Sequence, residues 1–150
     1  MSASRDTGRA MSRENVELVR RVCEANDRGD LTAVFASYDP EIEWHVLGLA
    51  SAELGFDPVY VGHDGVRTFW RLWLSAWETT SFEYDEFIDA GEHVVVVQTQ
   101  RNRGRTSGIE LEWNSYAQVW TMQDAKVVRV EFFPTRGEAL EALEAVGLRD

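Results

Sequence analysis

Residues 81–134 read SFEYDEFIDAGEHVVVVQTQRNRGRTSGIELEWNSYAQVWTMQDAKVVRVEFFP, and this stretch decides the fold. Apolar residues alternate with acidic ones through Phe82–Ile88, up to a turn around Gly91. A β-branched run then opens the segment Val94–Arg101. Because successive side chains of a strand point to opposite faces, the alternation predicts a strand with one buried face, and the β-branched run predicts a central strand.

Two further strands follow in the same stretch. A turn rich in Arg, Gly and Ser, Asn102–Gly108, precedes the long alternating segment Ile109–Met122. The tight turn Gln123–Ala125 then leads into Val127–Phe133, which Pro134 ends. Consecutive long strands without helices between them predict an antiparallel meander.

The residues before the meander predict helices. Ser12 is expected to cap a first helix that stops at Gly29, and Asp30 to cap a short second one that ends by Pro40. A third helix is expected to start at Asp64. Helices segregated from a run of strands indicate an α+β fold.

The remaining segments complete the predicted domain. Glu41–Leu47 alternates and predicts a short strand, whereas residues 48–62 are Gly-rich and irregular, as a loop over a cavity mouth would be. Residues 136–146 predict a final helix, with Gly147 just past its end. Residues 1–11 are polar and aperiodic and predict a disordered extension, so that residues 12–148 form one domain.

Composition excludes several classes of protein. The 26 acidic and 15 basic residues give a formal net charge of −11, which disfavours nucleic acid and anionic membranes as partners. The single cysteine excludes an intrachain disulfide, and the three histidines show no metal-binding spacing, so no metal site is expected. Without an apolar signal segment or a membrane-length apolar run, we expect a cytoplasmic protein.

Taken in order, several stretches resemble the nuclear transport factor 2-like superfamily, specifically its SnoaL-like, polyketide cyclase-like branch. The resemblance covers residues 12–148 and is carried by Asn15–Ala25, Arg28–Leu31, Asp39–Trp44, Tyr60–Arg67, Phe87–Gly91, Val119–Met122 and Glu138–Leu140. It implies a cone in which a bent antiparallel sheet wraps three N-terminal helices, with a short C-terminal helix and a pocket open at one end. It also implies dimers through the sheet and, for enzymes of the group, acid–base chemistry without a cofactor.

The same resemblance suggests two catalytic candidates. His45 stands where isomerase-like members carry their general base, and Glu131 where hydrolase-like members carry a carboxylate. The ketosteroid-type oxyanion hole is absent, because its positions correspond to Val22 and Gln118. We predict that His45 and Glu131 share one pocket with Tyr116 and Gln118. In the alternative register, His45 points outward and Trp44 lies on the inner face.

Alternation along the strands suggests which residues bind a substrate. If Gln118 faces the pocket, Asn114, Tyr116 and Trp120 face it too, and Leu111, Trp113 and Val119 form an opposite apolar face for a homodimer. The full predicted substrate-binding set is Trp44, Trp73, Gln98, Asn114, Tyr116, Gln118 and Trp120.

Two hypotheses about function remain open from the sequence. In the first, the chain is a cofactor-free acid–base enzyme of isomerase, cyclase or hydratase type, acting on a small hydrophobic or ring-containing substrate. In the second, it is a non-catalytic dimeric module that binds a hydrophobic ligand or another partner.

Overall fold

A computed structural model describes residues 2–46 and 55–149, with the side chains of residues 12–46, 55–112 and 116–145. The helices are α1 (Ser2–Asp27), α2 (Leu31–Ala36), α3 (Gly62–Ser75) and α4 (Arg136–Arg149). The strands are β1 (Tyr38–His45), β2 (Val59–Val61), β3 (Trp77–Ala90), β4 (His93–Gly104), β5 (Glu110–Gln123) and β6 (Lys126–Phe133). No helix in the described part of the chain is long and apolar enough to cross a membrane.

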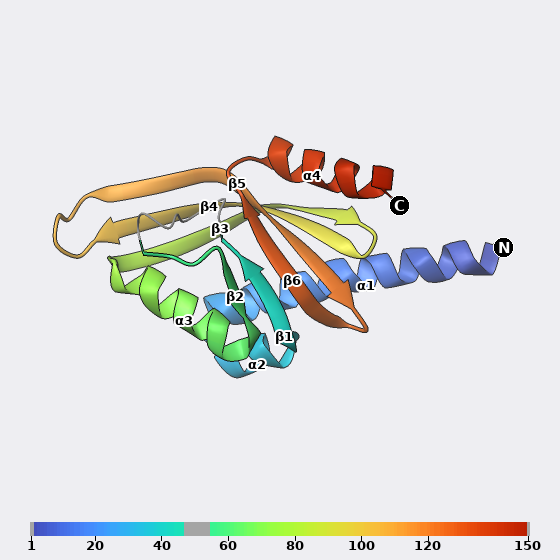
Figure 1. Cartoon of the computed structure of the whole chain (residues 1–150), viewed down its shortest axis with the longest axis horizontal. Helices are drawn as coiled ribbons and strands as arrows, with labels where there is room; N and C mark the ends of the chain where they lie inside the picture. Colours follow the sequence, from blue (N-terminus) through green and yellow to red (C-terminus); the bar gives the residue numbers. More distant parts are fainter. Residues whose placement is uncertain (1, 47–54, 150) are drawn as a thin grey trace.

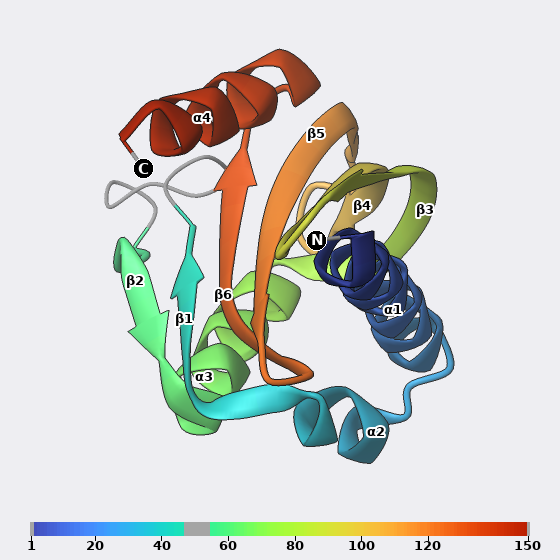
Figure 2. The same ribbon diagram turned by 90° about the vertical axis from the view of Figure 1, so that its right-hand side faces the viewer.

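The six strands form one curved sheet in the order β2-β1-β6-β5-β4-β3 (Figure 2). Strands β3 to β6 pair antiparallel with their sequence neighbours, which confirms the predicted meander. Strand β1 pairs with β6 in parallel, so the sheet is mixed. This pairing joins segments far apart in the chain, and local sequence patterns carry no information about it.

Helices cover both faces of the sheet (Figure 1). The three N-terminal helices lie against the face that we call the inner face, and α4 lies across the opposite, outer face. This is the α+β arrangement that the sequence predicts. On the outer face, Val95 and Val119 form a small buried cluster with Ala139 of α4. The chain itself therefore covers Val119, one of the residues predicted for a dimer interface.

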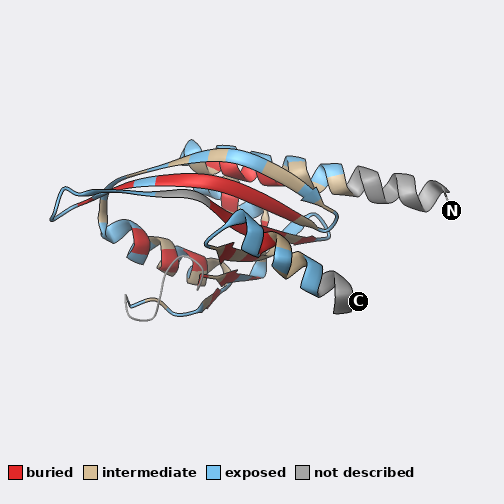
Figure 3. Cartoon of the chain, turned by 90° about the horizontal axis from the view of Figure 1, so that it is seen from above, coloured by how far each residue is buried: buried red, intermediate tan, exposed pale blue. Residues whose placement is uncertain are grey.

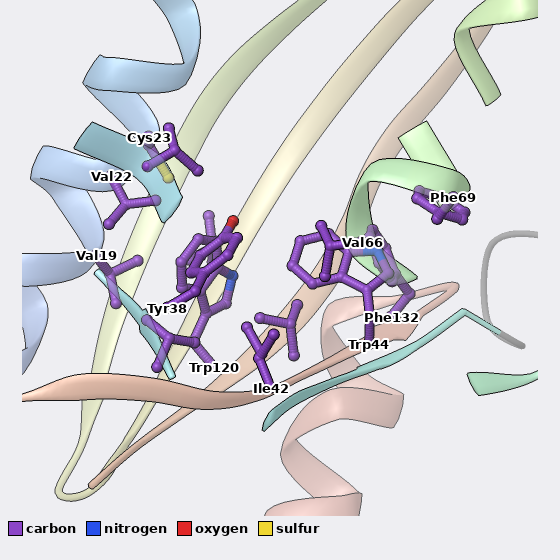
Figure 4. Packing of buried hydrophobic residues seen from close by; sticks show 14 of the residues in the cluster. Val19, Val22, Cys23, Tyr38, Ile42, Trp44, Val66, Phe69, Trp120 and Phe132 are labelled. Atoms are coloured by element: carbon purple, nitrogen blue, oxygen red, sulfur yellow. The ribbon is translucent and has the colours of Figure 1, made fainter. Parts of the chain in front are cut away.

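The main core lies between the inner face and the N-terminal helices (Figures 3 and 4). Valines of the central strand β4 and aromatic residues of β1 and α3 dominate it, including Trp44, Phe69 and Trp73. Full burial of each such side chain contributes about 1.5–3 kcal/mol to the stability of the folded state. Figure 4 shows Tyr38 and Trp120 close together, between Val22 and Cys23 of α1 and the part of the core that holds Trp44.

Local signals in the sequence explain most of the element boundaries. The Asp30 carboxylate accepts a hydrogen bond from the Ala33 amide at 3.2 Å and so caps α2, as predicted. The hairpin between β5 and β6 turns through Asp124 and Ala125, whose φ angles are 51° and 60°. A turn with two positive φ angles matches the twist of the strands, but alanine adopts this conformation at a cost.

Several predicted helix ends differ from the structure. Helix α1 begins at Ser2, so residues 2–11 are helical where disorder was expected, and Ser12 is not its cap. Strong helix formers surround Ser12, and extending an existing helix costs little. Ser12 instead donates a hydrogen bond to Asp89. Helix α3 begins at Gly62, before Asp64, and α4 continues past Gly147. Part of the predicted mouth loop, residues 47–54, lies outside the described residues.

Candidate functional site

A hollow with two adjoining parts lies between the inner face of the sheet and helices α1, α2 and α3. Its deep part, the inner cavity, has a volume of about 30 Å³ and is lined by Val22, Cys23, Asn26, Tyr38, Trp44, Trp70, Phe82, Tyr84, Gln98, Gln118 and Trp120. Its wider part, the outer groove, has a volume of about 490 Å³ and is lined by Asn26, Leu31, Val34, Phe35, Tyr38, Val66, Arg67, Trp70, Arg71, Leu74, Thr80 and Phe82. Four residues belong to both linings, so the groove and the cavity adjoin each other.

The residues that line the inner cavity include two glutamines, Gln98 and Gln118, among aromatic and aliphatic side chains. Gln118 Oε1 accepts a hydrogen bond from the Trp120 indole Nε1 at 2.9 Å. In contrast, Trp44 Nε1 and Gln98 Nε2 are buried and have no hydrogen-bond partner among the described residues. A buried donor without a partner costs about 1–3 kcal/mol. A ligand that accepts these hydrogen bonds would recover that cost.

The two unpaired groups differ in what they select. The Trp44 indole is only a donor, so the ligand atom opposite it must be an acceptor. The Gln98 amide can rotate and present either its oxygen or its nitrogen. Trp44 therefore requires a hydrogen-bond acceptor in the ligand, whereas Gln98 can pair with either a donor or an acceptor.

A second polar group on the inner face is fully paired. Gln100 Oε1 accepts hydrogen bonds from Trp73 Nε1 at 2.8 Å and from Asn102 Nδ2 at 2.7 Å, and Gln100 Nε2 donates to the Tyr116 hydroxyl at 3.0 Å. Thr80 Oγ1 donates to Asn102 Oδ1 at 2.8 Å and closes the network. Because these partners satisfy one another, Gln100 belongs to the framework and Gln98, two residues before it, belongs to the cavity.

Burial keeps the titratable groups of the inner cavity uncharged. Removal from water raises the pKa of the Cys23 thiol to about 12, with the nearby Asp27 charge adding to the shift. Burial likewise raises the pKa of Tyr38 and of Tyr84 well above the usual value. At neutral pH the described wall of the inner cavity therefore carries no charge.

His45 and Glu131 do not line this hollow. They are register partners on the parallel strands β1 and β6 and lie on the outer face of the sheet. His45 Nε2 lies 2.9 Å from Glu43 Oε1, and Glu131 pairs with Arg129 at 2.8 Å. Glu131 borders a separate hollow beside α4.

The prediction that the pair shares a pocket with Tyr116 and Gln118 is therefore wrong. Ile42, Trp44 and Val46 occupy the inner positions of this segment. Because neighbouring residues of a strand face opposite sides, this register turns His45 outward, and the alternative register given above is the correct one.

The predicted substrate-binding residues divide into three groups. Trp44, Gln98, Gln118 and Trp120 line the inner cavity. Trp73 and Tyr116 lie on the inner side but belong to the Gln100 network. The Asn114 side chain lies outside the described residues, as does that of Trp113.

Sequence reasoning missed the contribution of the helices to the cavity. Val22, Cys23 and Asn26 of α1 line it, and so does Trp70 of α3. The signal was Asn26, a polar residue in line with an apolar helical stripe, one turn after Val22 and Cys23. Tyr38 was expected to extend the second helix, but it begins strand β1.

Comparison with known proteins agrees with this architecture. The family model described as "SnoaL-like domain" matches residues 19–130. The chain belongs to the SnoaL-like domain family. The nuclear transport factor 2-like fold of this family is the cone seen here, with the hollow on its inner side. No curated protein matches the sequence.

Solved structures similar to this SnoaL-like chain share its fold over most of their length. An NTF2-like protein of unknown function from Burkholderia pseudomallei is 28% identical, with a TM-score of 0.71 over 87% of this chain and 97% of that one. An NTF2-like protein from Burkholderia thailandensis is 29% identical, with a TM-score of 0.69 over 79% and 88%. TerC, co-crystallised with polyporic acid, is 24% identical, with a TM-score of 0.70 over 87% and 97%, and its likeness concerns the fold alone.

The described residues offer no cluster for a metal ion. Among them, no group of three or more His, Cys, Asp and Glu side chains is placed to hold one.

Proposed function

We propose that this SnoaL-like protein binds a small, largely apolar, ring-containing molecule whose oxygen atom accepts a hydrogen bond from Trp44. The observation that carries the proposal is the buried Trp44 Nε1, which has no partner in the described structure and belongs to a residue that lines the inner cavity. The ring system would lie in the outer groove against Trp70 and Phe82, which border both the cavity and the groove. Aromatic rings favour such walls because they stack on them.

The lining favours binding over acid–base catalysis. General acids and bases work best when their pKa lies near the ambient pH, but burial moves the Cys23 pKa to about 12. A catalytic role for His45 and Glu131 would require a substrate on the outer face, beside α4. We also propose that the protein is cytoplasmic and dimeric, with the exposed Ile109 and Leu111 of the β4–β5 end in the interface.

Matched ligands test the proposal. Fluorene and fluorenone have the same ring skeleton, but only fluorenone has a carbonyl acceptor. We expect calorimetric titration to show that both bind and that fluorenone binds about three- to tenfold more tightly, in line with a net hydrogen bond of about 0.5–1.5 kcal/mol.

Two tryptophan variants identify the donor. Trp44→Phe removes the unpaired N–H, so its affinities for the two ligands should become equal. Trp120→Phe is the matched control, since the Trp120 N–H already donates to Gln118. This variant should keep the preference for fluorenone. Failure of both ligands to bind, or a preference that survives Trp44→Phe, would contradict the proposal.

A further inference from the structure

The outer groove carries positive charge in a strongly acidic protein. Arg67 and Arg71 line it, and its other described lining residues include no carboxylate. The two arginines are four residues apart on α3 and therefore lie on one side of that helix. The chain as a whole has a net charge of −11, which repels anions over long distances. Arg67 and Arg71 give the outer groove a local positive charge, which attracts anions.

The two guanidinium groups are placed differently. Arg67 lies 4.4 Å from the centroid of the Phe35 ring and 3.1 Å from a carboxylate oxygen of the solvent-exposed Asp64. The ring contact holds its guanidinium at the groove wall. Arg71 is exposed and has no ion pair with any described residue. It is thus available to an incoming anion.

Two carboxylates next in sequence to the groove-lining Asn26 and Leu31 already have partners elsewhere. Asp27 accepts a hydrogen bond from the Tyr84 hydroxyl at 3.4 Å. Asp30 caps α2 and lies 3.8 Å from the Arg28 guanidinium. Neither one lines the groove or pairs with its arginines.

We infer that the ligand of this site is an aromatic acid, and this inference rests on the proposed function. Its ring system occupies the groove and cavity, and its carboxylate or other acidic group stays at the groove mouth beside Arg67 and Arg71. The acid remains partly solvated there, and its uncharged oxygen reaches the uncharged inner cavity. Arginine suits this role because its planar donors match a carboxylate and its charge is permanent.

The experiment compares fluorenone with a fluorenone carboxylate that bears the acid on an outer ring. We expect the carboxylate to bind wild-type protein about fivefold more tightly than fluorenone at low ionic strength, and salt to erode this difference. Arg71→Gln should weaken the carboxylate about three- to fivefold, and Arg67→Gln combined with Arg71→Gln should abolish its advantage. Both variants should weaken the carboxylate several-fold more than they weaken fluorenone, whose rings contact the same groove wall.

Arg105→Gln is the matched control, because Arg105 lies in the exposed β4–β5 turn and is not among the residues that line the groove. This variant makes the same change in net charge and should leave both affinities unchanged. If fluorenone binds and the carboxylate binds no more tightly, or if Arg105→Gln has the same effect as Arg71→Gln, the inference is wrong while the proposed function stands. If fluorenone does not bind at all, the proposed function itself fails.

Discussion

Gln98 and Gln100 lie on the same face of β4, are both buried, and should respond oppositely to the same substitution. Gln98→Leu removes a buried nitrogen that has no partner, and leucine has a similar volume. Since an unpaired buried donor costs about 1–3 kcal/mol, we expect the free energy of unfolding of the ligand-free protein to rise by about 1 kcal/mol or more. For a domain of this size, that corresponds to about 2–4 °C in melting temperature.

Gln100→Leu has the reverse effect, because three groups lose their partner. Trp73 Nε1, Asn102 Nδ2 and the Tyr116 hydroxyl all bond to the Gln100 amide. At about 1 kcal/mol for each group left without a hydrogen bond, we expect the free energy of unfolding to fall by about 3 kcal/mol. Urea unfolding of the two variants and the wild type measures both effects. The slope of the unfolding free energy against urea concentration should be the same for all three proteins. If Gln98→Leu destabilises the protein as much as Gln100→Leu does, Gln98 is a framework residue and our division of the inner face is wrong.

Further predictions concern other parts of the molecule. Because its pKa is about 12, the Cys23 thiol should resist iodoacetamide at pH 8 until the chain unfolds. The free energy of unfolding should fall between pH 9 and 12, since the unfolded state releases a proton that the native state keeps. Rapid alkylation of the native protein would refute this prediction. Ala125→Gly should raise the free energy of unfolding by about 1 kcal/mol, since glycine adopts the φ of 60° without strain; a loss of stability in urea would contradict it. Deletion of residues 1–11 should leave the melting temperature unchanged, and a fall of several degrees would show that this part of α1 stabilises the fold. Sedimentation should show a dimer at micromolar concentration that Leu111→Glu dissociates, and a wild-type monomer would rule out the interface.

The sequence predicts the strands well because alternation is a local signal. The hairpins β3–β4 and β5–β6 follow directly from runs of alternating residues separated by turn residues. The parallel pairing of β1 with β6 depends on the packing of the whole chain and has no local signature. The sequence also does not show that α4 covers Val119, because an apolar strand face can be covered by its own chain or by a second copy.

The site was predicted less well than the fold, for a geometric reason. Whether His45 or Trp44 faces inward depends on a one-residue register, and family alignment alone placed the wrong one inside. Gln118 and Trp120 lie on one face of β5, as the alternation of that strand predicts, and both line the inner cavity. The arginines of α3 were overlooked, since a charged residue on an amphipathic helix is normally solvated, and only the tertiary structure brings them to the groove.

The central claim is that a ligand oxygen accepts the hydrogen bond that Trp44 Nε1 leaves unpaired. The most direct test follows the indole N–H signals of the six tryptophans by NMR during titration with fluorenone, assigning Trp44 by its absence in Trp44→Phe. We predict a downfield shift of the Trp44 N–H proton with fluorenone, but not with fluorene. If fluorenone binds and this proton moves no more than it does with fluorene, the account is wrong.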